Sequence, residues 1–121
     1  MSFSSYFSPM CETRELHSDP QLRTRYYKNS FKQCLEAFES MAKAGNFDVR
    51  NVNPEHGELY VISNGYDMIV TITQVTPIES GIDFKVNFFS FAGFGRPKKK
   101  VVEFYKQLDS LLKFKGVALH P

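Results

Sequence analysis

Four basic residues near the end of the chain have types and a spacing that suit anion binding: Arg96, Lys98, Lys99 and Lys100. They follow two glycines and flank Pro97, a residue that is common in the first turn of a helix. Cations in a first turn oppose the helix dipole, at a cost of roughly a few tenths of a kcal/mol each. A phosphate, a lipid head group or an acidic partner would offset that cost. We therefore interpret Gly93–Lys100 as an anion-binding candidate, with a solvated basic turn as the alternative.

Residue types that perform catalysis do not cluster in this sequence. The three histidines lie apart, and no paired-histidine, Cys-x-x-Cys or Gly-x-Ser-x-Gly pattern occurs. We therefore predict no metal site, no cofactor and no catalytic group. If the chain is a small enzyme, Asp67 beside a turn or His56 within one is the candidate base. Glu55, His56 and Glu58 have the residue types of a cation site but are typical of a solvated turn.

A second candidate surface faces away from the predicted core. Alternation in the expected strands places six side chains on or beside the outer face of a sheet: Tyr60, Ile62, Ile69, Thr71, Phe89 and Phe91. Contiguous exposed apolar side chains usually mark a contact surface. We expect this face to be covered by the first 20 residues or by a second copy in a homodimer. The aromatic side chains of this face could also bind single-stranded nucleic acid by stacking on its bases. The ribonucleoprotein strand motif is absent, however, so a nucleic-acid partner is not expected.

Charge is distributed unevenly along the chain. The net charge is +2, but residues 93–121 carry a net +5 and residues 1–92 a net −3. A basic end on an acidic remainder favours attraction to an anionic partner, or head-to-tail pairing. The overall basic excess is smaller than is usual for a nucleic-acid-binding domain.

Two helices are expected to position these groups. Ser30 and Gln33 have the spacing of a capping box, and apolar residues then recur every three or four positions. This pattern predicts a helix over residues 31–44 that ends at a left-handed Gly45. Pro97 opens a second helix that extends to about residue 114, again with one apolar stripe.

Strands account for most of the remaining chain. Period-two alternation predicts strands over residues 22–28, 47–52, 59–63, 66–73 and 82–88. Asn64-Gly65 favours a type I′ turn, in which both central residues have positive φ. A two-residue loop there pairs Ser63 with Tyr66, Val61 with Met68 and Leu59 with Val70.

These elements predict an α+β fold with the order β-α-β-β-β-β-α. Consecutive strands with short connections form an antiparallel meander, so we expect a two-layer sandwich in which both helices pack on one face of a sheet of four to five strands. The core face is made by Leu59, Val61, Met68, Val70, Ile72, Phe84 and Val86. We expect an irregular N-terminal arm over residues 1–20, a single domain over 21–116 and a C-terminal tail over 117–121.

The strand from Phe47, the turn Pro54–Gly57, the strand to Ser63, the meander and the closing helix together resemble small bacterial α-β4-α domains, many of them of unknown function. The resemblance covers about residues 28–116; the arm and the first strand depart from it. It implies the fold and a bacterial cytosolic protein, and it carries no catalytic residue across. No segment has the length and apolarity of a transmembrane helix or the pattern of a secretory signal, so we expect a cytoplasmic protein.

Three functional hypotheses remain open at this point. The first is a non-enzymatic binding or protein-interaction module, which the outer face and the lack of catalytic residues favour. The second is anion or nucleic-acid binding through the basic segment Gly93–Lys100. The third is a small enzyme that uses Asp67 or His56 as its base.

Overall fold

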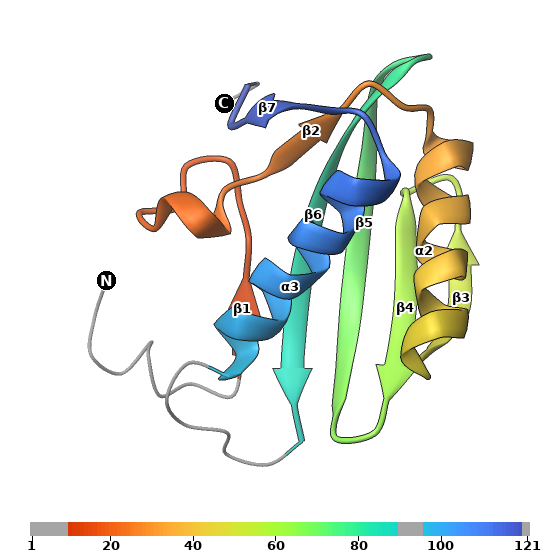
Figure 1. Ribbon diagram of the computed structural model, residues 1–121, viewed down its shortest axis with the longest axis vertical. Helices are drawn as coiled ribbons and strands as arrows, with labels where there is room; N and C mark the ends of the chain where they lie inside the picture. The colour runs from red at the N-terminus through yellow and green to blue at the C-terminus, as the bar shows by residue number, and fades with distance from the viewer. Residues whose placement is uncertain (1–9, 90–95, 120–121) are drawn as a thin grey trace.

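The fold is a seven-stranded antiparallel sheet with two α-helices on one of its faces (Figure 1). The computed structural model describes residues 10–89 and 96–119. In chain order its elements are β1 (Met10–Glu12), the 3₁₀ turn η1 (Pro20–Leu22), β2 (Arg25–Tyr27), α2 (Phe31–Gly45), β3 (Asp48–Asn53), β4 (Glu58–Ser63), β5 (Tyr66–Thr76), β6 (Glu79–Phe88), α3 (Arg96–Leu111) and β7 (Phe114–Val117). The sheet order is β3-β4-β5-β6-β2-β7, and β1 also pairs with β6. The predicted α+β class is confirmed, with more strands than expected.

The core lies between the sheet and the helices. All seven side chains predicted for this face are buried: Leu59, Val61, Met68, Val70, Ile72, Phe84 and Val86. The Phe84 ring centre lies 5.7 Å from that of Phe38 on α2, and 5.7 Å and 4.9 Å from those of Phe104 and Tyr105 on α3. Burial of each such ring contributes about 1.5–3 kcal/mol. These aromatic contacts fix both helices against β6.

Helix α2 begins as predicted and ends one residue later than predicted. The Ser30 hydroxyl accepts from the Gln33 N–H, and the Gln33 side chain accepts from the Ser30 N–H, which completes the capping box. Asn46 takes the left-handed conformation, with φ 55°, and donates its N–H to the Ala42 carbonyl. The prediction that Gly45 fills this position is wrong. Asn is one of the few other residue types that adopts this conformation readily.

The β4–β5 hairpin has the predicted register but a different turn. Ser63 pairs with Tyr66, Val61 with Met68 and Leu59 with Val70. Gly65 has φ 94°, whereas Asn64 is not among the described residues with positive φ. The turn is therefore not type I′, which needs positive φ at both central residues. The register is retained because the two-residue loop and the alternating apolar side chains of both strands are as predicted.

The ends of the chain contribute two strands that were not predicted, β1 and β7. Strand β2 is shorter than the expected strand 22–28, because Leu22 belongs to η1. Helix α3 ends at Leu111 rather than near residue 114, since the Lys113 N–H donates to the Asn29 side chain at 2.8 Å and the chain turns toward β2 to form β7. Among the described residues, no helix is long and apolar enough to cross a membrane.

Candidate functional site

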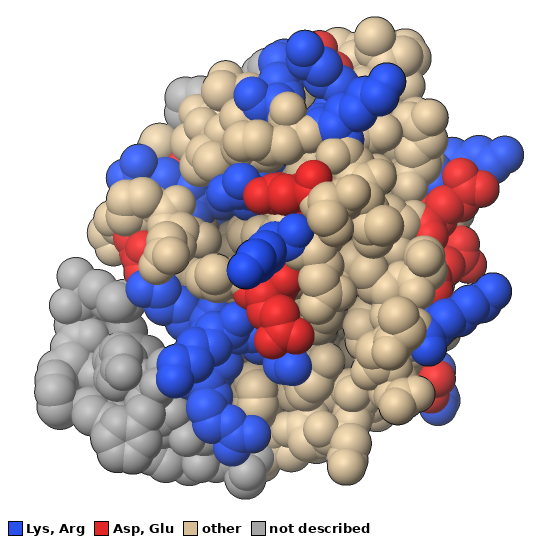
Figure 2. Space-filling view, in the orientation of Figure 1, with Lys and Arg blue, Asp and Glu red and all other residues tan. Residues whose placement is uncertain are grey.

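A cavity of about 300 Å³ lies where the first turn of α3 meets the β4–β5 turn and the end of β6. Three of the four predicted basic residues line it, together with an amide, two aromatic rings and a carboxylate: Arg96, Lys99, Lys100, Asn64, Tyr66, Phe88 and Glu103. We call this cavity the basic cleft. Figure 2 shows Lys and Arg side chains gathered over the start of α3. The glycines of the predicted loop, Gly93 and Gly95, lie outside the described residues.

Aromatic rings hold two of the cations in the basic cleft. The Arg96 guanidinium lies 5.1 Å from the centre of the Phe88 ring. The Lys100 ammonium lies 5.3 Å from the centre of the Tyr66 ring and 5.8 Å from that of Phe104. Cation–π contacts contribute about 0.5–1 kcal/mol at exposed sites. They also orient the positive groups in advance, which reduces the conformational entropy lost when a ligand binds.

The floor of the cleft is neutral and tightly packed. The rings of Tyr66 and Phe88 stack with centres 5.5 Å apart, and the two residues are only 7% and 8% exposed. Burial is the main cause that raises the pKa of the Tyr66 hydroxyl. The cleft therefore presents cationic groups to a ligand, and little aromatic surface on which another ring can stack.

The positive charge of the cleft is only partly compensated. Within the described part of the chain, Arg96, Lys99 and Lys100 take part in no ion pair. Glu103 is the one carboxylate among the lining residues. Three cations and one carboxylate leave a net charge of +2 around the cavity. A phosphate group, with a charge of about −1.5 to −2 near pH 7, matches this excess.

Lys98, the fourth predicted residue, has a different role. Its ammonium lies 2.7 Å from the carboxylate of Asp19, which also accepts the Gln21 N–H at 3.0 Å and caps η1. Burial by itself would raise the pKa of Asp19. The hydrogen bonds from Lys98 and the Gln21 backbone, together with the charge of Lys98, outweigh burial and lower that pKa. Lys98 therefore ties the segment before β2 to α3 and does not line the cleft.

The outer face of the sheet contains most of the second predicted group. The ladders place Tyr60 opposite Ile69, and Ile62 and Thr71 on the same side, away from the helices. Ile69 is 40% exposed, and Phe89, just after β6, is 58% exposed. Phe91 lies outside the described residues. The first 20 residues were expected to cover this face. The part of them that forms β1 pairs with the edge of β6 instead.

Acidic side chains surround the apolar residues of the outer face. Asp67 lies opposite Ile62 in the β4–β5 ladder, and Thr71 lies between Glu58 and Asp83. Lys85 lies opposite Ile69, and Arg50, close enough to Tyr60 to affect the pKa of its hydroxyl, is a second basic residue near this face. The outer face therefore has a negative character, whereas the basic cleft lies on the helix side of the sheet.

The two candidate bases are not brought together. The Asp67 carboxylate accepts a hydrogen bond from the Tyr60 hydroxyl at 2.8 Å. His56 lies in the β3–β4 turn, with its Nδ1 2.9 Å from the Asn53 side-chain amide. The turn with His56 precedes β4, whereas Asp67 pairs with Ile62 near the other end of that strand. Among the described residues, no group of three potential ligands is arranged to hold a metal ion.

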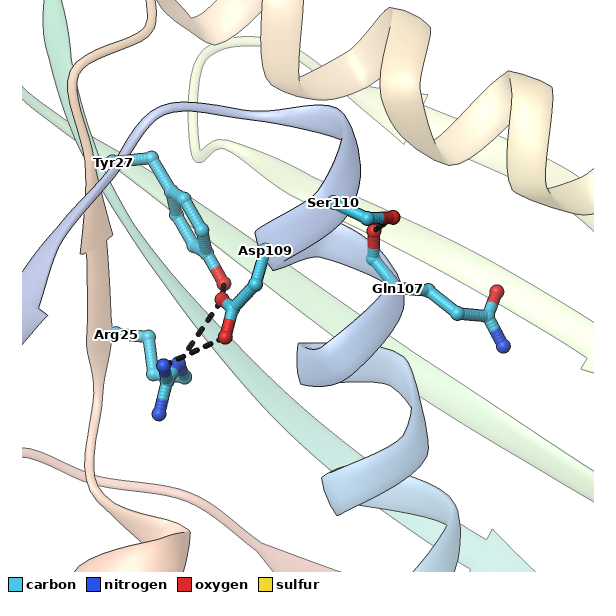
Figure 3. A network of polar contacts seen from close by, with 5 residues as sticks. All are labelled: Arg25, Tyr27, Gln107, Asp109 and Ser110. Atoms are coloured by element: carbon cyan, nitrogen blue, oxygen red, sulfur yellow. Dashed lines mark hydrogen bonds and ion pairs between the residues drawn. The ribbon is translucent and has the colours of Figure 1, made fainter.

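Sequence reasoning missed a polar network that joins β2 to α3 (Figure 3). Arg25 donates to both carboxylate oxygens of Asp109, from Nη2 at 2.8 Å and from Nε at 3.3 Å. The Tyr27 hydroxyl donates to the same carboxylate at 2.7 Å. The Arg25 guanidinium also lies 4.2 Å from the centre of the Phe114 ring on β7. These groups already have partners, so we interpret the network as a structural connection between three elements.

A second missed cluster lies at the edge of β6, between its pairings with β1 and β2. Asp83 Oδ1 accepts from the Thr13 hydroxyl at 2.6 Å and from the Thr24 hydroxyl at 2.7 Å. The Thr13 oxygen accepts from the Phe84 N–H at 2.9 Å and from the Tyr105 hydroxyl at 3.2 Å. Burial raises the pKa of the Asp83 carboxyl above its ordinary value. The hydrogen bonds from Thr13 and Thr24 lower this pKa, but by less than burial raises it. These side chains replace the strand pairing that is interrupted here.

Sequence reasoning also did not assign Asn64, Tyr66 and Phe88 to the anion site. The strand pattern placed Tyr66 and Phe88 on the core face, and Asn64 only in a turn. Their proximity to the cations depends on tertiary packing, which local sequence patterns do not reveal. Phe104 packs against Tyr66, with ring centres 6.5 Å apart, and this contact brings α3 to this end of the sheet.

No protein-family model, curated protein or solved structure matches the chain. The resemblance to small α-β4-α domains therefore rests on the pattern of elements. What the protein binds has to be inferred from its own surface.

Proposed function

We propose that the protein is a non-enzymatic binding module and that the basic cleft binds an anionic group, with phosphate as the best-matched chemistry. The main support is the position of Arg96, Lys99 and Lys100 around one cavity, without an ion-pair partner among the described residues. Their net excess of two positive charges over Glu103 balances the two negative charges of a phosphate dianion. The start of α3 adds the positive end of a helix dipole, which favours an anion.

Binding fits the lining residues better than catalysis does. Among the described residues that line the cleft there is no histidine, cysteine or serine, and Glu103 is the one carboxylate. The candidate bases considered above, His56 and Asp67, make their polar contacts elsewhere. Cations fixed on aromatic rings are suited to hold an anion in place.

Thermal unfolding in phosphate and in chloride at equal ionic strength tests this proposal. A ligand at ten times its Kd stabilises the folded state by about 1.4 kcal/mol, which raises Tm by several degrees in a domain of this size. We expect phosphate to stabilise the wild-type protein and to lose this effect in Lys99→Glu. Lys99 is exposed in the first helical turn, so this substitution leaves the core intact.

Lys32→Glu is the matched control. Lys32 is likewise exposed in the first turn of a helix, α2, but does not line the cleft. It should respond to phosphate as the wild type does. Equal phosphate stabilisation of Lys99→Glu and Lys32→Glu would rule out the basic cleft as the anion site.

A second candidate is an interaction surface on the outer sheet face, which Ile69, Tyr60 and Ile62 favour. The helices pack on the opposite face, and Ile69 remains 40% exposed. If this face joins two copies, light scattering should show a dimer that Ile69→Lys dissociates. Added salt should strengthen it, because carboxylates such as Asp67 and Glu58 would then face their own copies. A monomer at all concentrations would exclude the homodimer.

A further inference from the structure

The end of the molecule that contains the basic cleft also exposes an aromatic ring. Phe89 is 58% exposed, more than any other described aromatic residue. Its N–H donates to the Gly65 carbonyl at 3.0 Å, so it lies beside the turn whose Asn64 lines the cleft. Because neighbouring residues of an extended chain point to opposite sides, Phe88 forms the floor of the cleft and Phe89 is turned to solvent.

The sequence around this end combines apolar and basic residues. Strand β6 ends at Phe88, Phe89 follows it directly, and Arg96 and three lysines begin helix α3. Among the described residues, Phe89, Arg96 and Lys99 are exposed. Exposed aromatic rings beside cations are the combination that binds an anionic bilayer surface, where the ring enters the interface and the cations attract head-group phosphates.

We infer that this end of the molecule docks on a membrane surface that contains anionic phospholipid. The phosphodiester of a lipid head group, which carries one negative charge, occupies the basic cleft, and neighbouring anionic head groups balance the remaining positive charge. Phe89 enters the interfacial layer beside it. This inference rests on the proposed anion-binding function and adds the source of the anion. The protein attaches to the membrane surface through this end, and the rest of the domain remains in water.

The aromatic geometry favours a membrane over a single-stranded nucleic acid. Bases bind such proteins by stacking on the open faces of several aromatic rings. In the cleft, Arg96 and Lys100 lie against the rings of Phe88 and Tyr66, both of which are buried. Phe89 alone offers a largely exposed ring among the described residues. One ring beside three cations suits a bilayer interface better than a row of bases.

Two acidic side chains near this end limit how it can approach the membrane. Glu103 lines the cleft on the following turn of α3. Asp67 lies on the outer face two residues after the β4–β5 turn, where the Tyr60 hydroxyl holds its carboxylate at 2.8 Å. Repulsion of these two carboxylates from an anionic surface disfavours an approach along either face of the sheet. The molecule therefore approaches end-on, with the β4–β5 turn, the start of α3 and Phe89 toward the lipid.

Co-sedimentation with vesicles measures the electrostatic part of this inference. We expect the protein to bind phosphatidylcholine vesicles that contain about 30% phosphatidylglycerol and not vesicles of phosphatidylcholine alone. Each basic residue near such a surface contributes about a fivefold factor in affinity, so Lys99→Glu, which changes the charge by two units, should weaken binding about thirtyfold. Lys32→Glu, exposed on α2, should bind as the wild type does.

A pair of apolar substitutions tests the role of the exposed ring. Phe89→Ser should weaken vesicle binding about tenfold, because the interface then loses an aromatic side chain. Ile78 is 70% exposed at the other end of the β5–β6 hairpin, so Ile78→Ser should leave vesicle binding unchanged. Neither side chain is part of the core, so both variants should fold, which their unfolding curves would verify.

Four results would overturn the inference. Equal binding to both kinds of vesicle would remove its electrostatic basis, and equal effects of Phe89→Ser and Ile78→Ser would remove the role of Phe89. Tighter binding to a short single-stranded oligonucleotide than to the anionic vesicles would identify a different partner. If inorganic phosphate stabilises the protein but no vesicle binds it, membrane docking fails and the proposed anion site stands; if both effects are absent, both fail.

Discussion

Gly57 and Gly65 both have positive φ, 65° and 94°, but their surroundings differ. A Cβ added to Gly57 would lie 2.1 Å from the carbonyl oxygen of Ile72, whereas nothing lies within 4 Å of one added to Gly65. A non-glycine residue in this region is strained by roughly 1–2 kcal/mol. We therefore expect Gly65→Ala to lower the free energy of unfolding by about 1 kcal/mol, and Gly57→Ala by about 3 kcal/mol or more. Urea unfolding measures both, and equal losses would contradict the steric argument.

Asp83 is expected to make stability depend on pH. Burial raises its pKa above the ordinary value of 3.8, so the folded protein keeps this proton at pH values where the unfolded chain releases it. The contribution of this group to stability is therefore largest below the ordinary pKa and declines as the pH rises through the raised pKa. Asp83→Asn keeps an oxygen acceptor for Thr13 and Thr24 and removes the titration.

Urea unfolding from about pH 4 to pH 7 measures this effect. The difference in stability between Asp83→Asn and the wild type should shift in favour of the variant as the pH rises. A difference that stays constant over this range would show that Asp83 does not titrate in it.

The anion site could be predicted at the residue scale only in part. Proline, glycines and clustered cations marked the start of α3, and the structure places Arg96, Lys99 and Lys100 around one cavity. Nothing in the sequence separated Lys98 from them, because its partner Asp19 lies in a distant turn. The same limit applies to Arg25 and Asp109, which are 84 residues apart.

The elements at the C-terminal side are connected by one ion-pair network. Asp109 of α3 accepts from Arg25 and Tyr27 of β2, and Arg25 packs on Phe114 of β7. Removal of this carboxylate leaves the Tyr27 hydroxyl, in a fully buried residue, without its acceptor. We expect Asp109→Ala to lower the free energy of unfolding by about 2 kcal/mol, measured by urea unfolding.

Glu103→Ala is the control for this prediction, since Glu103 is an exposed carboxylate on the same helix. Its removal should change stability by less than about 0.5 kcal/mol. It should also increase phosphate affinity, because the cleft loses its acidic residue. A loss of stability as large as that of Asp109→Ala would show that the effect does not arise from the network.

Long, regular elements were predictable and short edge strands were not. Strand β6 alternates over ten residues and α2 has both a cap and an apolar stripe, so local patterns define them. Strands β1 and β7 have three and four residues, too few for a period, and depend on the neighbouring strands β6 and β2 for their register. The extra strands extend the sheet without changing the predicted core face.

Basic residues gather at the start of α3, although acidic side chains also lie on the helix side of the sheet (Figure 2). Helix α3 contributes Arg96, Lys99 and Lys100 to the basic cleft on the helix side, whereas Asp67, Glu58 and Asp83 lie on the outer face. This arrangement explains how a chain with a net charge of only +2 can present a strongly basic site. It also orients the molecule, because an anionic surface attracts the end that contains the start of α3.

Amide chemical shifts during a titration with inorganic phosphate test the central claim, anion binding in the basic cleft, most directly. The predicted result is a saturating shift confined to residues 64–66 and 96–100, absent in Lys99→Glu and retained in Lys32→Glu. Added sodium chloride should weaken the binding, since the cations of the cleft lie near the surface. Shifts spread evenly over the basic surface, or shifts that persist in Lys99→Glu, would contradict the claim.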